Sequence, residues 1–333
     1  MDSKLSFDQK NYKTGIARNK INNKYQYFYI NTNKPVSKID KLRIDNLKIP
    51  PNWINVWVSS DKLTPIQVVG IDSKGRKQYR YNQEHIKKAE KEKFLRLEQF
   101  IQSAPKLNTQ MLKDKKKNFF NKNKVIQTML QLVKELHIRV GKECYAKTNK
   151  SYGISSLKKS HATIKENVLN LKFKGKSNKR LHYTSKNKYV IEHIEQLLKL
   201  DGDKLFQYRD QNNNIRRVTD TDLNQYIQEY MGKDFTCKDF RTYAANFHFV
   251  KSLLNETSKR KPKNDTIIKK NIKLALEKTA FYLKHTKAIS KKSYIMNFTV
   301  NLYSSNPAYF IDNKNNDTND VLLNILKLYK QSL

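Results

Sequence analysis

Apolar and polar residues alternate in several short stretches near the start of the chain. Every second position is apolar from Ile54 to Val58, and an apolar run over residues 66–71 precedes the mixed stretch 77–81. Residues 72–75, Asp-Ser-Lys-Gly, separate the last two stretches and have the composition of a turn. The pattern predicts a small antiparallel β-sheet.

The pattern becomes helical at about residue 85. Between His85 and Gln102, hydrophobic residues recur on one helical stripe. Pro105 is expected just beyond the end of this helix. We therefore divide the chain into a β-rich N-terminal domain, residues 1–85, and a larger domain, residues 86–333.

The larger domain combines helices with one predicted hairpin. Apolar residues alternate over 169–173, residues 175–178 have turn composition, and the alternation returns over 181–183. Helical repeats flank this hairpin, over residues 124–137 and from Tyr189 nearly to the end of the chain. The sequence thus predicts an α+β protein whose second domain is mainly helical with an embedded hairpin.

The composition is strongly basic: 67 Lys and Arg against 30 Asp and Glu give a formal net charge of +37. Basic residues occur along the whole chain rather than in one tail, and 19 Tyr and 15 Phe provide material for packed cores. A folded protein of this charge is expected to bind a polyanion such as a nucleic-acid backbone. A codon bias toward Lys, Asn and Ile would explain part of the same composition.

The two cysteines of the chain, Cys144 and Cys237, indicate a reducing compartment and form neither a disulfide framework nor a zinc site. No apolar run approaches the ~20 residues of a membrane-spanning helix. Residues 1–10 are polar, unlike a secretory signal. We expect a soluble intracellular protein without a membrane partner.

Signatures of nucleotide or metal chemistry are missing from the sequence. Gly175-Lys176-Ser177 resembles the end of a phosphate-binding loop, but Asn170 stands where that motif needs glycine. No dense cluster of Asp and Glu suggests a two-metal site. We therefore expect no metal and no cofactor. Phosphate chemistry would then need Arg to neutralise non-bridging oxygens, Lys to protonate a leaving oxygen and Tyr as nucleophile.

Two segments in the C-terminal half carry such residues at fixed spacing. His285 and Tyr294 lie nine positions apart, and this pair resembles the His…Tyr signature of type IB DNA topoisomerases and tyrosine recombinases. Residues 236–246 resemble the topoisomerase segment Lys-Asp-x-Arg-Thr-Tyr, where recombinases usually carry His-x-x-Arg. The family positions in this segment are Lys238, Arg241 and Asn246.

Earlier segments extend the resemblance. Residues 138–145 resemble the family's Arg-x-Gly-x-x-x-Tyr helix end, which places Arg139 on the first catalytic arginine and Tyr145 on a tyrosine that touches a DNA phosphate. The predicted hairpin carries Phe-Lys-Gly-Lys-Ser, which resembles Phe-x-Gly-Lys-Asp, so Lys176 falls on the catalytic lysine. Ser177 replaces the usual Asp, and assistance from that carboxylate is not expected here.

The first domain resembles blocks of the small viral and bacterial branch, the poxvirus- and mimivirus-like topoisomerases. The matching stretches are residues 49–58 and 70–81. Tyrosine recombinases lack them, because their N-terminal domain is helical. The resemblance implies that side chains of the last strand face DNA, and the matching positions are Arg76, Gln78, Tyr79 and Tyr81.

A fold and a mechanism follow from this resemblance. The two domains are expected to clamp double-stranded DNA as a monomer, and Tyr294 to attack a phosphodiester and form a 3′-phosphotyrosyl bond. Arg139 and Arg241 would hold the non-bridging oxygens, His285 would donate a hydrogen bond to one of them, and Lys176 would protonate the departing 5′-hydroxyl. Supercoils would relax without ATP or metal.

Two alternatives remain at the level of the sequence. A tyrosine recombinase or integrase shares Arg, Lys, His and Tyr, and the β-rich first domain argues against it. A non-catalytic DNA-binding protein would share the charge, and the intact set of five residues argues against it. The sequence leaves open whether the surrounding cations favour the phenolate of Tyr294 or water takes its proton. It also leaves open which DNA sequence is cleaved.

Overall fold

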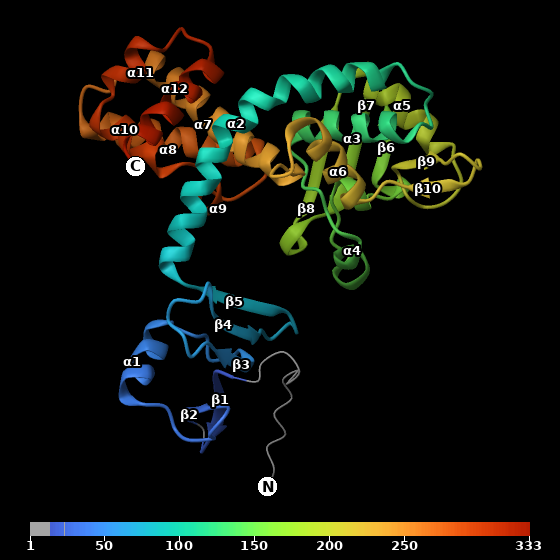
Figure 1. Ribbon diagram of the computed structural model, residues 1–333. Helices are drawn as coiled ribbons and strands as arrows, with labels where there is room; N and C mark the ends of the chain where they lie inside the picture. Colours follow the sequence, from blue (N-terminus) through green and yellow to red (C-terminus); the bar gives the residue numbers. More distant parts are fainter. Residues whose placement is uncertain (1–13, 23) are drawn as a thin grey trace. The chain divides into compact units, whose positions relative to one another are not determined.

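The computed structural model describes residues 14–22 and 24–333 (Figure 1). The chain separates into two compact units, residues 1–93 and 94–333. The boundary between them falls inside one long helix, α2 (Gln83–Lys115). Residues 1–10, where the sequence predicts no secretory signal, lie outside the described residues.

Unit 1 is built on a five-stranded antiparallel sheet with the order β2-β1-β3-β4-β5. The sequence pattern predicted an antiparallel sheet and its strands β3, β4 and β5, but not β1 and β2. One helix, α1, adds Ile44 to a small core that contains Ile16 and Val58. Sequence reasoning did not predict this helix. The elements are β1 (Ile16–Ile21), β2 (Lys24–Tyr29), α1 (Lys38–Asn46), β3 (Ile54–Val58), β4 (Ile66–Ile71) and β5 (Lys77–Tyr81).

Helix α2 corrects the prediction that the first helix ends before Pro105. The helix runs through this proline to Lys115. Proline costs about 3 kcal/mol inside a helix, because it lacks an N–H and clashes with the preceding turn. Buried apolar side chains on both sides of the proline hold the helix together; they are Phe94, Leu97, Phe100, Leu107 and Met111. Tertiary packing therefore outweighs the local signal.

The predicted hairpin is present in unit 2 as β7 (Val168–Lys174) and β8 (Arg180–Ser185). Its side chains alternate strictly: Leu171 and Phe173 are buried, whereas Lys172 and Lys174 are exposed. A third strand, β6 (Ala162–Lys165), pairs with β7 and was not predicted. In this three-stranded antiparallel sheet, β7 is the central strand and β8 an edge strand, and one face of the sheet lies in the core.

Helices make up most of the rest of unit 2. They form two buried clusters: α3, α5 and α6 pack with the three-stranded sheet, and α8, α10, α11 and α12 pack together at the other end, with α7 contributing to both (Figure 1). The helices are α3 (Lys122–Leu136), α4 (Glu143–Asn149), α5 (Lys188–Leu198), α6 (Asp220–Met231), α7 (Cys237–Lys259), α8 (Asp265–Tyr282), α9 (Lys287–Ser293), α10 (Asn297–Ser305), α11 (Ala308–Asp312) and α12 (Thr318–Gln331). The small strand pair β9 (Gln207–Arg209) and β10 (Ile215–Arg217) interrupts the stretch predicted to be helical.

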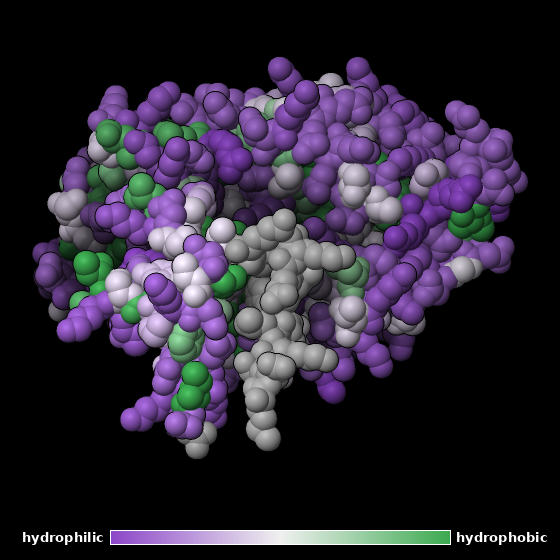
Figure 2. Space-filling view, turned by 60° about the horizontal axis from the view of Figure 1, so that its bottom comes forward, coloured by the Kyte–Doolittle hydropathy of each residue, from purple (hydrophilic) through white to green (hydrophobic). Residues whose placement is uncertain are grey.

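Hydrophilic residues cover most of the face shown in Figure 2, as the basic composition predicts. No helix in residues 14–22 and 24–333 is both long and apolar enough to cross a membrane. Over the same residues, His, Cys, Asp and Glu side chains nowhere gather in groups of three that could hold a metal ion. Cys144 is exposed and Cys237 is buried.

Candidate active site

Four of the five predicted catalytic side chains meet in unit 2. Nε2 of His285 lies 2.8 Å from Nη2 of Arg139 and is also hydrogen-bonded to Nη2 of Arg241. The rings of His285 and Tyr294 have centroids 4.8 Å apart, and the guanidinium carbon of Arg241 lies 5.8 Å from the centroid of the Tyr294 ring. Residues separated by up to 155 positions in the chain (139 to 294) thus form one cationic cluster around a tyrosine.

Arg139 follows α3 on a tightly held segment. His137 ends the helix in a left-handed conformation, and the carbonyl of Arg139 accepts a hydrogen bond of 2.8 Å from the N–H of Ile154. Gly141 has φ +76°, and a Cβ there would lie 2.6 Å from the backbone N of Gly153. Only glycine at this point lets the two backbones approach so closely. Gly141 therefore allows a close contact between two protein segments, which holds the backbone beside Arg139.

Arg241 lies on the buried face of α7 and is only 2% exposed. Thr236 and Asp239 form a capping box that starts this helix, which explains the Asp of the Lys-Asp-x-Arg segment. Nη2 of Arg241 donates to the carbonyl of Leu283 over 3.0 Å. Its Nε and Nη1 are buried and have no hydrogen-bond acceptor among the described residues. A buried guanidinium with free donors is prepared for an anionic ligand.

His285 is neutral in this arrangement, with its proton on Nδ1. Both arginines can only donate, so Nε2 of His285 must accept and cannot carry a hydrogen. Burial lowers the pKa of His285 to about 3, together with the positive charges of Arg241 and Arg139. Its Nδ1 is buried and has no partner among the described residues. The imidazole therefore occupies the position between the arginines that an anion could take.

Tyr294 caps the short helix α9, which begins two residues after His285 and brings the two rings together. Burial by itself would raise the pKa of Tyr294, but the charges of Arg241, Arg139 and Lys176 outweigh it and lower the pKa. A lowered pKa makes the phenolate, the nucleophilic form, more accessible. The cluster thus lowers the pKa of the tyrosine for which the family resemblance implies the role of nucleophile.

Lys176 lies at the tip of the hairpin, in the turn η3 (Lys176–Asn178), and is exposed. It makes no hydrogen bond within the described residues, although its charge contributes to the lowered pKa values of His285 and Tyr294. Ser177 and Asn178 both have positive φ, so the tip is a tight turn. Nearby, Nζ of Lys179 donates to the carbonyl of Lys284 over 3.2 Å, which links the hairpin to the residue before His285.

The other predicted DNA contacts of unit 2 differ in exposure. Tyr145 on α4 is 55% exposed, and Lys238 in the first turn of α7 is also exposed. Asn246 is only 1% exposed. Its amide NH₂ donates to the carbonyls of Thr242 and Tyr294, and its oxygen accepts from the N–H of Met296. Its burial and these bonds argue against the predicted direct contact of Asn246 with DNA, because its amide is committed to backbone groups of Thr242, Tyr294 and Met296.

In unit 1, the four predicted DNA-contact residues lie on or beside the edge strand β5. Arg76 and Gln78 are both hydrogen-bonded to the carboxylate of Asp72. The exposed rings of Tyr79 and Tyr81 are stacked with centroids 6.1 Å apart. Because neighbouring residues of a strand point to opposite faces, Gln78 and Tyr79 lie on different faces of the sheet. Because β5 is an edge strand, one ligand that wraps around this edge can contact side chains on both faces of the sheet.

Comparisons with known proteins agree with this architecture. The family profile described as the catalytic core of eukaryotic DNA topoisomerase I matches residues 67–306. The chain belongs to the type IB DNA topoisomerases. A second profile, the N-terminal domain of bacterial DNA topoisomerase IB, matches residues 24–72. The protein is therefore an isomerase of the topoisomerase class that acts on DNA.

Viral relatives cover nearly the whole topoisomerase chain. It is 54% identical over 333 residues to DNA topoisomerase 1B of Acanthamoeba polyphaga mimivirus, with 99% of each chain covered. It is 27% identical over 290 residues to DNA topoisomerase I of monkeypox virus, with 85% of this chain and 87% of that one covered. A fungal DNA topoisomerase 1 from Mycosarcoma maydis is 29% identical over 181 residues, which are 47% of this chain and 18% of that one.

Two features of this topoisomerase site were missed in the sequence. Asn246 holds the backbone around Tyr294, and no sequence signal separates this task from DNA contact. Tyr183 is buried beside the arginines, where burial raises its pKa although the charges of Arg241 and Arg139 act in the opposite direction. The sequence signal that could have identified Tyr183 was its position on the buried face of the predicted hairpin.

Proposed function

We propose that this topoisomerase relaxes supercoiled double-stranded DNA by cutting and resealing one strand, with Tyr294 as the nucleophile. The observation that carries the proposal is the position of Tyr294 beside Arg139, Arg241 and His285, where its pKa is lowered. The phenolic oxygen attacks phosphorus to form a 3′-phosphotyrosyl bond, and the bond to the 5′-oxygen breaks. One phosphoester replaces another, so the step is nearly balanced and needs no ATP.

The two arginines neutralise the non-bridging oxygens of the scissile phosphate. Arg241 has free buried donors at Nε and Nη1, and Arg139 has a guanidinium group bonded to His285. Fork-shaped guanidinium groups bind such oxygens in pairs, and a low-dielectric surrounding strengthens the attraction. When the phosphate takes these donors, Nε2 of His285 is released. The imidazole can then take the tautomer that donates a hydrogen bond to the phosphate.

The same arrangement of side chains determines the two proton transfers of the reaction. The cations around Tyr294 favour its phenolate, and no carboxylate among the described residues is hydrogen-bonded to Tyr294, so its proton passes to water. Lys176 protonates the departing 5′-oxygen from the hairpin tip, where its ammonium makes no hydrogen bond or ion pair with the residues that the structure describes. Religation reverses both transfers, with the 5′-hydroxyl as nucleophile and Tyr294 as leaving group.

Duplex contact extends beyond the scissile phosphate. We assign it to Tyr145 and Lys238 in unit 2, which are exposed, and to β5 and its turn in unit 1. The substrate is double-stranded DNA, and the active form of the enzyme is a monomer. The enzyme works in association with DNA inside the cell. The two domains predicted from the sequence are assigned the roles of DNA-clamping domain (residues 1–85) and catalytic domain (residues 86–333).

The test is relaxation of supercoiled plasmid without magnesium or ATP, by wild type and by Tyr294→Phe. Wild type should relax the plasmid and leave a covalent protein–DNA adduct when stopped with denaturant. The variant should do neither. Relaxation by Tyr294→Phe would overturn the choice of nucleophile. The absence of any adduct in wild type would favour a non-catalytic DNA-binding protein, and activity only as a tetramer on paired sites would favour a recombinase.

A further inference from the structure

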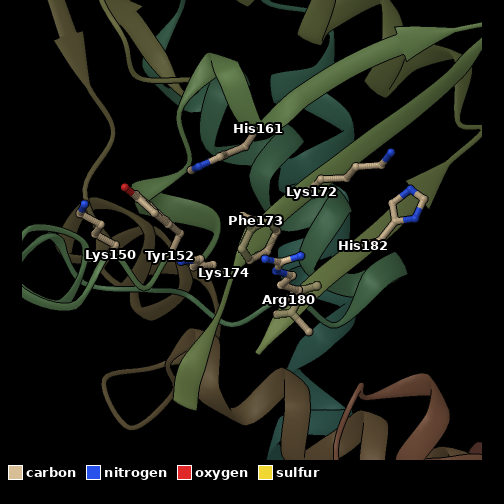
Figure 3. A pocket seen from close by; sticks show the side chains of 9 residues that line it. Lys150, Tyr152, His161, Lys172, Phe173, Lys174, Arg180 and His182 are labelled. Atoms are coloured by element: carbon tan, nitrogen blue, oxygen red, sulfur yellow. The ribbon is translucent and has the colours of Figure 1, made fainter. Parts of the chain in front are cut away.

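A hollow of about 570 Å³ in unit 2 is lined by the hairpin and by segments that follow α4, and none of the five predicted catalytic residues lines it (Figure 3). Four of its lining side chains come from the exposed face of β7 and β8: Lys172, Lys174, Arg180 and His182. We call these four the basic ladder. Lys150 adds a further cation from the segment that follows α4, and His161 adds a half-buried imidazole whose pKa is lowered by burial.

The pairing of the two strands places two like charges opposite each other, because Lys174 pairs with Arg180. Lys172 pairs with His182, whose Nε2 is hydrogen-bonded to Oδ1 of Asn170. Residues directly opposite in an antiparallel pair have Cβ atoms about 5 Å apart, and like charges there are destabilising. The buried face of the same strands carries ordinary apolar residues, so the core does not demand cations on the outer face. The basic ladder therefore weakens the free sheet rather than stabilising it.

No acidic side chain relieves this repulsion. The lining of the hollow contains no Asp or Glu. Across residues 14–22 and 24–333, no ion pair involves Lys150, Lys172, Lys174 or Arg180, although other surface cations, such as Lys158, do form ion pairs. A concave group of unpaired cations with no acid concentrates positive potential and attracts a polyanion.

The position of the hollow connects it to the reacting strand. Lys174 precedes Lys176 by two residues at the end of β7, and the segment after α4 is fixed against it by a hydrogen bond of 2.8 Å from the N–H of Tyr152 to the carbonyl of Lys174. Figure 3 shows Lys150 and Tyr152 on one side of the hairpin and Lys172 farther along it. Cations at every second residue of a strand repeat about every 7 Å. That distance is roughly the axial rise of two phosphates along one DNA strand.

We propose that this hollow binds backbone phosphates of the duplex adjacent to the scissile phosphate, with the basic ladder and Lys150 as the contacts. This rests on the proposed function, because Lys176 at the same hairpin fixes where the scissile phosphate lies. The contacts recognise phosphate and not base sequence. The hollow therefore sets affinity and the length of DNA held, and the cluster around Tyr294 performs the chemistry.

The test compares two double variants in the Tyr294→Phe background, so that no strand is cut. Lys172→Ala with Arg180→Ala removes two cations from the hollow. Lys165→Ala with Lys186→Ala removes two exposed cations of the same sheet region that do not line it. The slope of log binding constant against log salt should become shallower by about 0.9 per lost phosphate contact, up to about 1.8 for the first pair. The second pair should leave the slope unchanged.

Hydroxyl-radical footprinting then locates the contact. The cleavage position is mapped first from the covalent adduct of wild type, and the first double variant should lose protection at phosphates next to it. The charge-conserving pair Lys172→Arg with Arg180→Lys should restore both slope and protection. Equal slopes in the two double variants, or lost protection only at distant phosphates, would overturn the inference. Failure of wild type to form an adduct would instead overturn the proposed function, whatever the slopes.

Discussion

The cluster around Tyr294 and the basic ladder are both groups of cations without an acid, yet they differ in burial. Arg241 is 2% exposed, and its charge acts across a few ångströms on His285 and Tyr294, whose pKa values it lowers. The side chains of the basic ladder are exposed and lie opposite one another on two strands. Screening by water weakens interactions between exposed charges, whereas burial preserves their strength and fixes their direction.

The difference assigns each region a separate kind of work. Buried cations with fixed hydrogen-bond partners can stabilise charge that develops at one atom in a transition state. Exposed cations can bind a polyanion at many similar positions and contribute affinity that depends on salt. Variants of the two regions should therefore change different measurements.

The largest expected effect comes from Arg241. Arg241→Ala should slow single-turnover cleavage by about 10²- to 10³-fold, the usual cost of losing one preorganised donor to a transition state. Arg241→Lys should remain strongly impaired, because an ammonium cannot bind two oxygens in parallel. Quenched-flow measurement of adduct formation at saturating DNA gives the rate. A loss confined to DNA affinity, with the cleavage rate intact, would remove the distinction between the two regions.

Asn246 tests whether the position of Tyr294 matters as much as its surroundings. Asn246→Ala leaves the N–H of Met296 without its buried acceptor, which should cost about 1–3 kcal/mol of stability. Cleavage should also slow by roughly 10- to 100-fold, because the nucleophile is no longer held in place. The salt slope of DNA binding should equal that of wild type. A shallower slope would show that Asn246 contacts a phosphate after all.

Gly141 tests the support of Arg139. Gly141→Ala places a Cβ 2.6 Å from the backbone of Gly153 at positive φ, so it should cost about 1–3 kcal/mol and lower the cleavage rate. Gly75→Ala is the matched control: its φ is +71°, but nothing lies within 4 Å of the added Cβ, and the cost should be only about 1 kcal/mol. Urea denaturation and adduct formation measure the two effects. Equal losses in both variants would mean that φ alone, and not the contact with Gly153, matters.

The smallest effect is the dependence of stability on pH. Burial lowers the pKa of His285 to about 3, and that of His193 to about 4, from an unfolded value near 6.5. The unfolded chain therefore binds more protons between pH 6.5 and 4, and the free energy of unfolding should fall as the pH drops through this range. Urea denaturation at pH 7 and pH 5 measures the loss. It should be smaller in His193→Gln, and an unchanged loss would exclude that histidine as a source.

The sequence predicted most where local pattern and tertiary structure agree. The alternation in the hairpin and in β3 is visible in the chain because one face of each of these strands is buried. Strand β4 was read instead from its continuous apolar run, four residues of which are buried. Pro105 misled the prediction of α2, because contacts made by distant residues keep the helix intact on both sides of it. The strand pair β9–β10 was missed because each strand has only three residues.

In the candidate site, too, local motifs could be predicted from the sequence and contacts between distant segments could not. The order and spacing of five residue types could be read from the chain, because short motifs fix them. The double hydrogen bond of His285 to two arginines could not, since three separate segments create it. Asn246 was assigned to DNA because its type suits that task, whereas only its burial reveals what its amide holds.

The contrast between the two cysteines has a practical consequence. Burial raises the pKa of the Cys237 thiol to about 12, so this group next to the site resists thiol-directed reagents at neutral pH. Cys144 is exposed on α4, one residue before Tyr145. A maleimide fluorophore should therefore attach at Cys144 alone, without any engineered substitution. The natural enzyme offers a single spectroscopic reporter beside a proposed DNA contact, from which arrival and release of the duplex can be followed in real time.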